Sequence, residues 1–210
     1  LALVTAKDLT VKTTGSSGAI KTGSGITDTN TENITGTFKI ASGGDFTSST
    51  DTISTASALS IAAGGAVDLN GAVTASGGFS SGGKVFDNTG GSITTTDSAI
   101  TIDHSGAVKV GGALSSGMGN VDIDSTGSTI TLNNTIETTS GQVSIDASGK
   151  TTVADAGDIT TTTGQVTFGA SRTGSLSTSG DVTTSGGDVK FSRSMVLGKD
   201  VSIDTGITEG

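Results

Sequence analysis

One short pattern recurs four times between residues 118 and 206. Apolar-polar-apolar triplets begin at Val121, Val143, Val166 and Val189, so their first residues lie 22, 23 and 23 residues apart. A fixed period of this length is typical of repeat proteins, in which each unit buries its apolar face only against its neighbours. Residues 118–206 are the most regular part of the chain, and their period constrains the fold more than any other feature.

Each unit continues with two further apolar patches and closes on small polar residues and glycine. In the last unit, the second patch is predicted at Val196 and Leu197, and the third at Val201 and Ile203. Apolar and polar residues alternate with a period of two, which indicates strands, and no window shows helical spacing. We predict three short strands per unit, with successive units paired in parallel about 4.8 Å apart. The predicted fold is all-β, a single-stranded parallel β-helix.

The same rhythm extends over residues 1–210, which we interpret as one continuous β-solenoid of about nine coils of roughly 22 residues. Residues 1–36 form an irregular first coil, and its extra length is predicted in the polar run 27–33, TDTNTEN. Phe79-Ser-Ser81 is a poor triplet, and the rest of that coil is predicted from Val85, Phe86 and Ile93. No linker or change in composition divides the chain.

The composition fits a solenoid better than a globular or a disordered chain. The hydrophobic share of 31% is low for a globular domain, but a coil needs only a few inward side chains. The 34 glycines can form tight corners, and the absence of proline preserves backbone donors in strands paired on both edges.

Charge and apolar patterning exclude several partners. A net charge of −9, with only 11 Lys and Arg residues, disfavours nucleic acid and anionic membranes. No apolar run has the length of a membrane span, so we predict no membrane insertion. The chain has no cysteine, which excludes disulfides and thiolate chemistry. It begins with Leu1 in place of an initiator Met, and we expect it to be a piece of a longer protein.

Aspartate recurs after the first strand of three successive coils, at Asp103, Asp124 and Asp146. Stacked carboxylates about 5 Å apart repel one another unless a cation or hydrogen-bond donors lie between them. One hypothesis is a Ca²⁺ site on this edge, to which Asp122 would contribute. We favour the alternative, in which each Asp caps its own corner through an Asx-type hydrogen bond. No other metal and no cofactor is predicted.

The sequence offers little for catalysis. His104 is the only histidine and is predicted to be a solvated corner residue. Asp122 and Asp124 point the same way from one strand, a separation compatible with glycoside hydrolysis. However, Trp and Tyr are absent, and Arg172 and Arg193 are the only arginines, so a carbohydrate groove has few groups to use. We predict no catalytic residues and no enzyme; a β-helical carbohydrate-active domain, such as a lyase or tailspike-like depolymerase, is the alternative.

Threonines precede the closing glycines of three units and are predicted to stack in two columns. The columns are Thr139, Thr162 and Thr184, and Thr138, Thr161 and Thr183. Stacked Thr side chains can pack their methyl groups and pass hydroxyl hydrogen bonds along the ladder, which would stiffen the solenoid. A flat Thr array that binds ice is a minor alternative.

Several runs resemble a known family. Residues 7–15 (KDLTVKTTG), 65–71 (GAVDLNG) and 141–149 (GQVSIDASG) resemble the degenerate repeats of filamentous haemagglutinin-like exoproteins, secreted β-helical adhesins of Gram-negative bacteria. The resemblance implies a right-handed parallel β-helix, export through an outer-membrane partner, and a location outside the cell or on its surface. That family's secretion domain has Asn-Pro motifs, which a chain without proline cannot contain. Secretion would then be directed from elsewhere in a parent protein.

These features together predict a mechanical function. The chain is expected to be a rod segment of a cell-surface adhesin or of an extracellular matrix fibre. Because neither end has an evident cap, its partners are predicted to be further coils of a parent chain or other copies stacked end to end. The sequence does not identify a host or cell-surface ligand.

Overall fold

A computed structural model describes residues 8–13, 15, 17–23, 26–28, 36–169 and 171–206. Within these ranges the chain forms 27 β-strands and no helix. The described residues accordingly include no helix that could cross a membrane.

The strands form three parallel sheets of nine strands each. Sheet 1 contains β1 (Leu9–Lys12), β4 (Thr37–Ser42), β7 (Ala58–Ala63), β10 (Phe79–Gly83), β13 (Ile100–His104), β16 (Val121–Ser125), β19 (Val143–Ala147), β22 (Val166–Phe168) and β25 (Val189–Phe191). Sheet 2 contains β2 (Ile20–Lys21), β5 (Phe46–Thr47), β8 (Val67–Asp68), β11 (Phe86–Asp87), β14 (Val108–Val110), β17 (Ile130–Leu132), β20 (Thr151–Val153), β23 (Leu176–Thr178) and β26 (Met195–Leu197). Sheet 3 contains β3 (Ile26–Asp28), β6 (Ile53–Thr55), β9 (Val73–Ala75), β12 (Ile93–Thr94), β15 (Leu114–Ser115), β18 (Ile136–Thr138), β21 (Ile159–Thr161), β24 (Val182–Thr184) and β27 (Ile203–Asp204).

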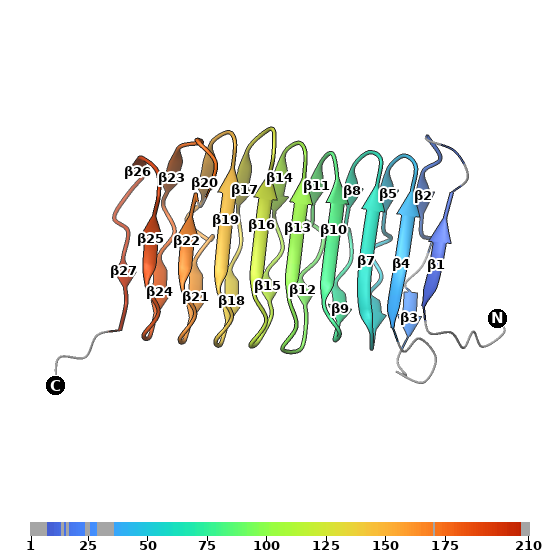
Figure 1. The fold of residues 1–210 in the computed structure, drawn as a ribbon, viewed down its shortest axis with the longest axis horizontal. Helices are drawn as coiled ribbons and strands as arrows, with labels where there is room; N and C mark the ends of the chain where they lie inside the picture. Colours follow the sequence, from blue (N-terminus) through green and yellow to red (C-terminus); the bar gives the residue numbers. More distant parts are fainter. Residues whose placement is uncertain are drawn as a thin grey trace.

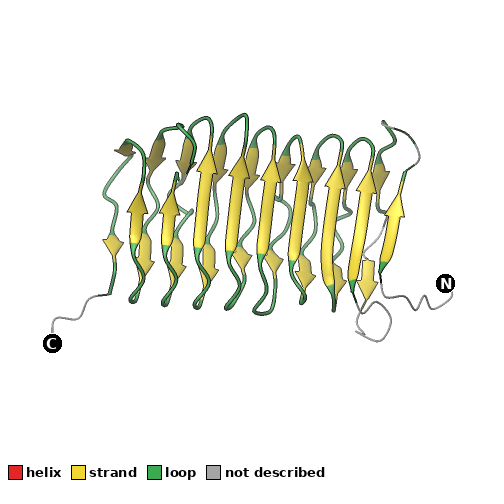
Figure 2. Cartoon of the chain, in the orientation of Figure 1, coloured by secondary structure: helices red, strands yellow, loops and turns green. Residues whose placement is uncertain are grey.

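Three consecutive strands, one in each sheet, make one rung, and the nine rungs stack in chain order. We number them from rung 1 (β1–β3) to rung 9 (β25–β27). In Figure 1 the nearer strands of sheet 1 run upward, the strands of sheet 3 run downward behind them, and the chain advances from right to left. This is a right-handed coil. Figure 2 shows the same arrangement, with strands joined by short turns. The predicted parallel β-helix is confirmed.

The inward side chains form continuous columns. Val121, Val143, Val166 and Val189 are consecutive partners in sheet 1, as the repeat predicted. The first three are buried and Val189 is half-buried at the last rung. Apolar side chains from all three sheets meet in one core, because alternation along each strand places every second residue inside. Burial of this core stabilises the stack.

Rung 9 corrects part of the predicted pattern. Met195 is the residue aligned with buried Leu176, whereas Val196 lies in the outward column and is 64% exposed. Leu197 is aligned with Thr178, a buried position, but is itself 52% exposed at the end of the stack. The predicted strand at Ile203 is present and pairs with β24.

The first rung is less regular, as predicted: eight residues separate β3 from β4, compared with two between β6 and β7. Thr27 and Asp28 belong to β3, which pairs with β6. Residues 29–33 of the predicted polar insertion lie outside the described residues. The irregularity therefore does not interrupt any of the three sheets.

Glycine is required where successive rungs approach most closely, at the turn that leads into sheet 1. Gly119, Gly141, Gly164 and Gly187 are aligned there, and a Cβ on any of the last three would overlap the carbonyl oxygen of the glycine one rung earlier. The absence of a side chain lets the turns stack at the spacing of the sheets.

Candidate functional site

The most extensive polar network lies where the strands of sheet 1 end. Asp103, Asp124 and Asp146 are consecutive neighbours in the register of β13, β16 and β19, so the predicted column is confirmed. Their exposure falls along the column: Asp103 is exposed, Asp124 is half-buried, and Asp146 is only 2% exposed. The three carboxylates therefore have different environments.

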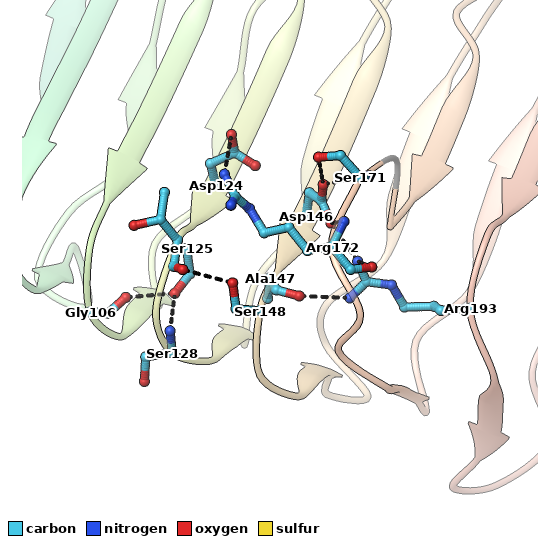
Figure 3. A network of polar contacts seen from close by, with 11 residues as sticks. Gly106, Asp124, Ser125, Ser128, Asp146, Ala147, Ser148, Ser171, Arg172 and Arg193 are labelled. Atoms are coloured by element: carbon cyan, nitrogen blue, oxygen red, sulfur yellow. Dashed lines mark hydrogen bonds and ion pairs between the residues drawn. The ribbon is translucent and has the colours of Figure 1, made fainter.

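Asp146 is held by a buried arginine and by the turn of the following rung (Figure 3). Its Oδ1 accepts a hydrogen bond from Arg193 Nη2 at 2.5 Å, and both side chains are 3% exposed. Its Oδ2 accepts from the backbone N and the Oγ of Ser171, at 2.8 and 2.7 Å. The backbone N of Arg172 also donates to Oδ1, at 3.2 Å. Every carboxylate oxygen of Asp146 thus has a donor, as a buried charge requires.

These contacts determine the protonation state of Asp146. Burial by itself would raise the pKa of the carboxyl, but the hydrogen bonds from Ser171 and Arg172 and the charge of Arg193 outweigh it and hold the pKa below its ordinary value. Asp146 is therefore an anion at neutral pH, and Arg193 compensates its charge.

Asp124 has a weaker partner. Its Oδ2 lies 3.4 Å from Arg172 Nη2, in a pair whose side chains are 30% and 26% exposed. Burial and the neighbouring carboxylate of Asp122 raise the pKa of Asp124, and Arg172 opposes this only in part. The repulsion expected between carboxylates on this edge is therefore present, although a guanidinium reduces it.

The turn between β22 and β23 makes both ion pairs possible. Seven residues separate these strands, compared with three between β19 and β20. The longer turn carries Arg172 back toward rung 6. Gly169, which begins it, has φ of +77°, and a Cβ there would overlap the guanidinium of Arg193. Glycine is needed at position 169 because it adopts the positive φ readily and because it leaves space for the guanidinium of Arg193.

Each ion pair skips a rung. Arg172 of rung 8 contacts Asp124 of rung 6, and Arg193 of rung 9 contacts Asp146 of rung 7. Parallel pairing alone connects only adjacent rungs. These two arginines therefore add contacts between rungs that are second neighbours in the stack. They link four successive rungs at one corner of the solenoid.

The network revises the predictions for the aspartates. Asp146 does not cap its own corner, because its backbone partners lie 25 and 26 residues further along the chain. Guanidinium groups provide positive charge beside Asp124 and Asp146, where Ca²⁺ was one hypothesis. In the described ranges, no three His, Cys, Asp or Glu side chains are grouped as metal ligands. Calcium binding at the edge formed by Asp103, Asp124 and Asp146, with a contribution from Asp122, stays a prediction.

His104 is not the solvated corner residue that the sequence suggested. Strand β13 continues two residues beyond the Ile100–Ile102 triplet, and alternation then places His104 inside the solenoid with 0% exposure. Its Nε2 lies 3.0 Å from Ser81 Oγ, and its ring packs against Phe86 at a centroid distance of 5.4 Å. Its Nδ1 has no hydrogen-bond partner in the described part of the protein. Burial lowers the pKa of His104 to about 4, although Asp103 acts in the opposite direction.

The poor triplet at Phe79–Ser81 is explained by this histidine. Phe79 and Ser81 are both buried and aligned with Ile100 and Ile102, so the strand is regular despite its sequence. Gly83 is aligned with His104, and a Cβ on Gly83 would lie 3.3 Å from the imidazole Cε1. Small residues in rung 4 thus provide space for a large polar ring in rung 5. A hydrophobicity pattern does not detect that small residues in one rung make space for a large side chain in the next.

The predicted alignment of Thr138 with Thr161 is confirmed, but the third threonine of this column is Thr184 and not Thr183. Thr138, Thr161 and Thr184 are aligned and buried, and each hydroxyl donates to the carbonyl of the glycine three residues later. The predicted assignment of Thr183 to this column was wrong because Gly187, not Gly186, aligns with Gly164. These three threonine hydroxyls form hydrogen bonds within the turns of their own rungs and not with the neighbouring rungs. Thr139 and Thr162 are exposed outside this column.

Comparisons of the chain with protein-family models, with curated proteins and with solved structures gave no match. The fold therefore defines the class by itself: the chain is a parallel β-solenoid repeat protein.

Proposed function

We propose that the chain is a structural rod segment of a secreted cell-surface adhesin or extracellular matrix fibre. The observation that carries this proposal is the continuity of the stack: all three sheets run through nine rungs. At about 4.8 Å per rung, the rod is about 40 Å long. Every internal strand is paired on both edges, so bending the rod would break hydrogen bonds in three sheets.

The surface chemistry supports a mechanical function. The chain has a net charge of −9, which keeps an elongated particle soluble. The buried polar groups of the corner network contact one another and the backbone, and so contribute to cohesion between rungs. The resemblance of residues 65–71 and 141–149 to filamentous haemagglutinin-like repeats supports a surface or extracellular location.

Removal of one rung tests the rod directly. Deletion of residues 59–78 joins Ala58 to Phe79, which are adjacent positions in the register of β7 and β10. We expect an eight-rung particle that is shorter by about 4.8 Å, measured by small-angle X-ray scattering, and still folded by circular dichroism. Deletion of residues 59–68 removes half a rung and is the matched control, which should disrupt the sheets. A particle of unchanged length, or equal tolerance of both deletions, would contradict the rod.

Location requires a separate experiment. Antibodies raised against the chain should label the surface of the producing cells or the material around them in electron micrographs. Labelling confined to the cytoplasm would contradict the extracellular part of the proposal and leave the rod itself intact.

A further inference from the structure

Sheet 1 presents a regular outward face from rung 2 to rung 6, on the side nearer the viewer in Figure 1. Its strands pair in unbroken register there, so the outward residues form straight columns. In rung order, one column contains Lys39, Ser60, Ser80, Thr101 and Asp122, and the next contains Ala41, Ala62, Gly82, Asp103 and Asp124. Each of these residues is at least partly exposed. Every one of these rungs has a neighbouring rung on both sides.

No large side chain protrudes from the centre of this face. In rungs 3 and 4 the two columns contain only small residues: Ser60, Ser80, Ala62 and Gly82. A hollow of about 370 Å³ lies beside them, lined by Gly78, Ser80 and neighbouring residues. Two sheets can pack face to face about 10 Å apart when their outer side chains permit this approach. The small residues therefore leave room for a second sheet.

The charged residues of the face are separated by sign. Lys39 is on rung 2, whereas Asp103, Asp122 and Asp124 are on rungs 5 and 6. Asp124 has Arg172 as its partner. In the described residues, no ion pair includes Lys39 or Asp122, and both are exposed. One cation and one anion thus lie four rungs apart in the same column, each available to a partner.

The other two faces lack this arrangement. In sheet 2, Lys109 of rung 5 already pairs with Asp87 of rung 4. In sheet 3, the outward column of rungs 2–6 contains one charged residue, Glu137, and otherwise Ser and Thr. Sheet 1 is therefore the face whose charges favour a specific partner.

A second copy related by a two-fold axis along β10 matches these charges. This rotation places rung 2 of one copy over rung 6 of the other, and rung 4 over rung 4. Lys39 of each copy then lies opposite Asp122 of the other, which gives one ion pair at each end of the contact. Ser80 lies at the axis and faces its own counterpart. The two central hollows face each other and would hold water that bridges the hydroxyls.

We infer that the outward face of sheet 1 is a docking surface for a second copy of the chain, packed face to face with the two solenoid axes in opposite directions. Such a contact uses the same patch on both copies, as two-fold dimers do. The inference rests on the proposed function and specifies that rod segments associate side by side.

The size of the contact indicates a weak dimer. Rungs 2–6 and five residues along each strand cover about 24 Å by 17 Å, or about 400 Å² per copy. The dimer would bury about 800 Å² in total, which is less than the roughly 1,200 Å² of most stable complexes. We therefore expect a dimer that depends on protein concentration and on the two ion pairs for its register.

Exchange of the two charges tests the docking. K39D places two carboxylates opposite each other at both ends of the contact, and D122K places two ammonium groups there. Each variant alone should dimerise about tenfold more weakly than the unmodified chain, because like charges face each other. An equal mixture of the two variants restores opposite charges at both ends and should form mixed dimers. Sedimentation equilibrium at low ionic strength measures all three association constants.

A matched control separates the contact from net charge. K150D makes the same change in net charge as K39D, but at an exposed position that precedes β20 of sheet 2. It should dimerise as the unmodified chain does. Circular dichroism of each variant verifies that the solenoid is folded.

Cross-linking tests the position of the axis, since the chain contains no cysteine of its own. S80C should be joined to itself by a bismaleimide with a reach of about 10 Å, the spacing of packed sheets. The product should be a covalent dimer with no larger species. T94C is the matched control, because Thr94 is exposed on sheet 3 of the same rung, and it should give several-fold less dimer.

Three results would overturn the docking. They are an unmodified chain that stays monomeric up to its highest soluble concentration, a mixture of K39D and D122K that forms no mixed dimers, and equal cross-linking of S80C and T94C. Small-angle X-ray scattering separates the two proposals. Monomeric particles about 40 Å long would contradict the docking alone, whereas particles without an elongated shape would contradict the rod.

Discussion

Rungs 4–6 and rungs 7–9 have the same backbone plan, but different side chains hold them together. In the first group, Ile100, Ile102, Val121 and Ile123 are fully buried, and the ion pair of Lys109 with Asp87 joins the adjacent rungs 5 and 4. In the second group, Val143, Val166 and Leu176 are buried as well. There the arginines of rungs 8 and 9 reach back across a whole rung to Asp124 and Asp146.

This difference shows two ways to make a solenoid cohesive. Apolar columns act between neighbours, so the stability of a stack is close to a sum of nearest-neighbour terms. An ion pair that skips a rung adds coupling between second neighbours and makes three rungs open together. Rungs 6–9, which the two arginines connect, have this additional coupling.

The largest effect is expected from removal of the buried charge partner. D146N leaves Arg193 buried without its anion, and loss of one member of a buried pair typically costs about 3–5 kcal/mol. We expect hydrogen exchange to accelerate in residues 160–206 and to change little in residues 58–125. D124N is the matched control, because its pair is partly exposed and should contribute about 1 kcal/mol or less. Uniform acceleration along the chain would mean that the two regions do not differ in this way.

The next effect concerns pH and the central rungs. Burial lowers the pKa of His104 in the folded chain to about 4, from the ordinary value of 6.5. The unfolded chain therefore takes up a proton between pH 6.5 and 4 that the folded chain does not, and stability falls as the pH falls through this window. At about 1.4 kcal/mol per pKa unit, the loss approaches about 3 kcal/mol.

Urea unfolding at several pH values measures this loss. The H104L variant, whose side chain does not titrate, should lack the decline between pH 6.5 and 4. Asp146, with its lowered pKa, contributes stability that is lost only at still lower pH, as the carboxylate is protonated. An identical pH profile for H104L and the unmodified chain would show that His104 is not the group responsible.

The smallest effect tests the hydroxyls that fasten the turns in both regions. T161V removes the 2.6 Å hydrogen bond to the Gly164 carbonyl and keeps the shape of the side chain. We expect a loss of about 1 kcal/mol in the free energy of unfolding. T160V, on the exposed side of the same strand, should change it by less than about 0.5 kcal/mol. Equal effects would contradict the inward position of Thr161.

The sequence predicted the architecture well because period and alternation are properties of the chain itself. The spacing of Val121, Val143, Val166 and Val189 equals one rung, and stacking follows wherever such triplets are paired in register. Predictions failed where a residue's direction depended on strand length or turn length. His104 turned inward because β13 is two residues longer than its triplet, and the paired glycines Gly186 and Gly187 concealed the alignment of Thr184.

The network at the corner could be predicted only in part. The aspartate column was visible as a spacing, but its partners Arg172 and Arg193 lie 48 and 47 residues from the carboxylates they contact. No repeat of about 22 residues indicates a contact between second neighbours. Burial of Asp146 also follows from the longer turn after β22, which brings Ser171 over the carboxylate.

The sequence by itself determined the all-β class, the length of a rung, the inward columns and the stacking of Asp103, Asp124 and Asp146. These features depend on short-range alternation and on one period, and both can be read along the chain. The tertiary structure alone decided that Arg193 compensates Asp146 and that His104 is enclosed beside Ser81. Those outcomes depend on volumes and charges that meet only after the rungs have stacked.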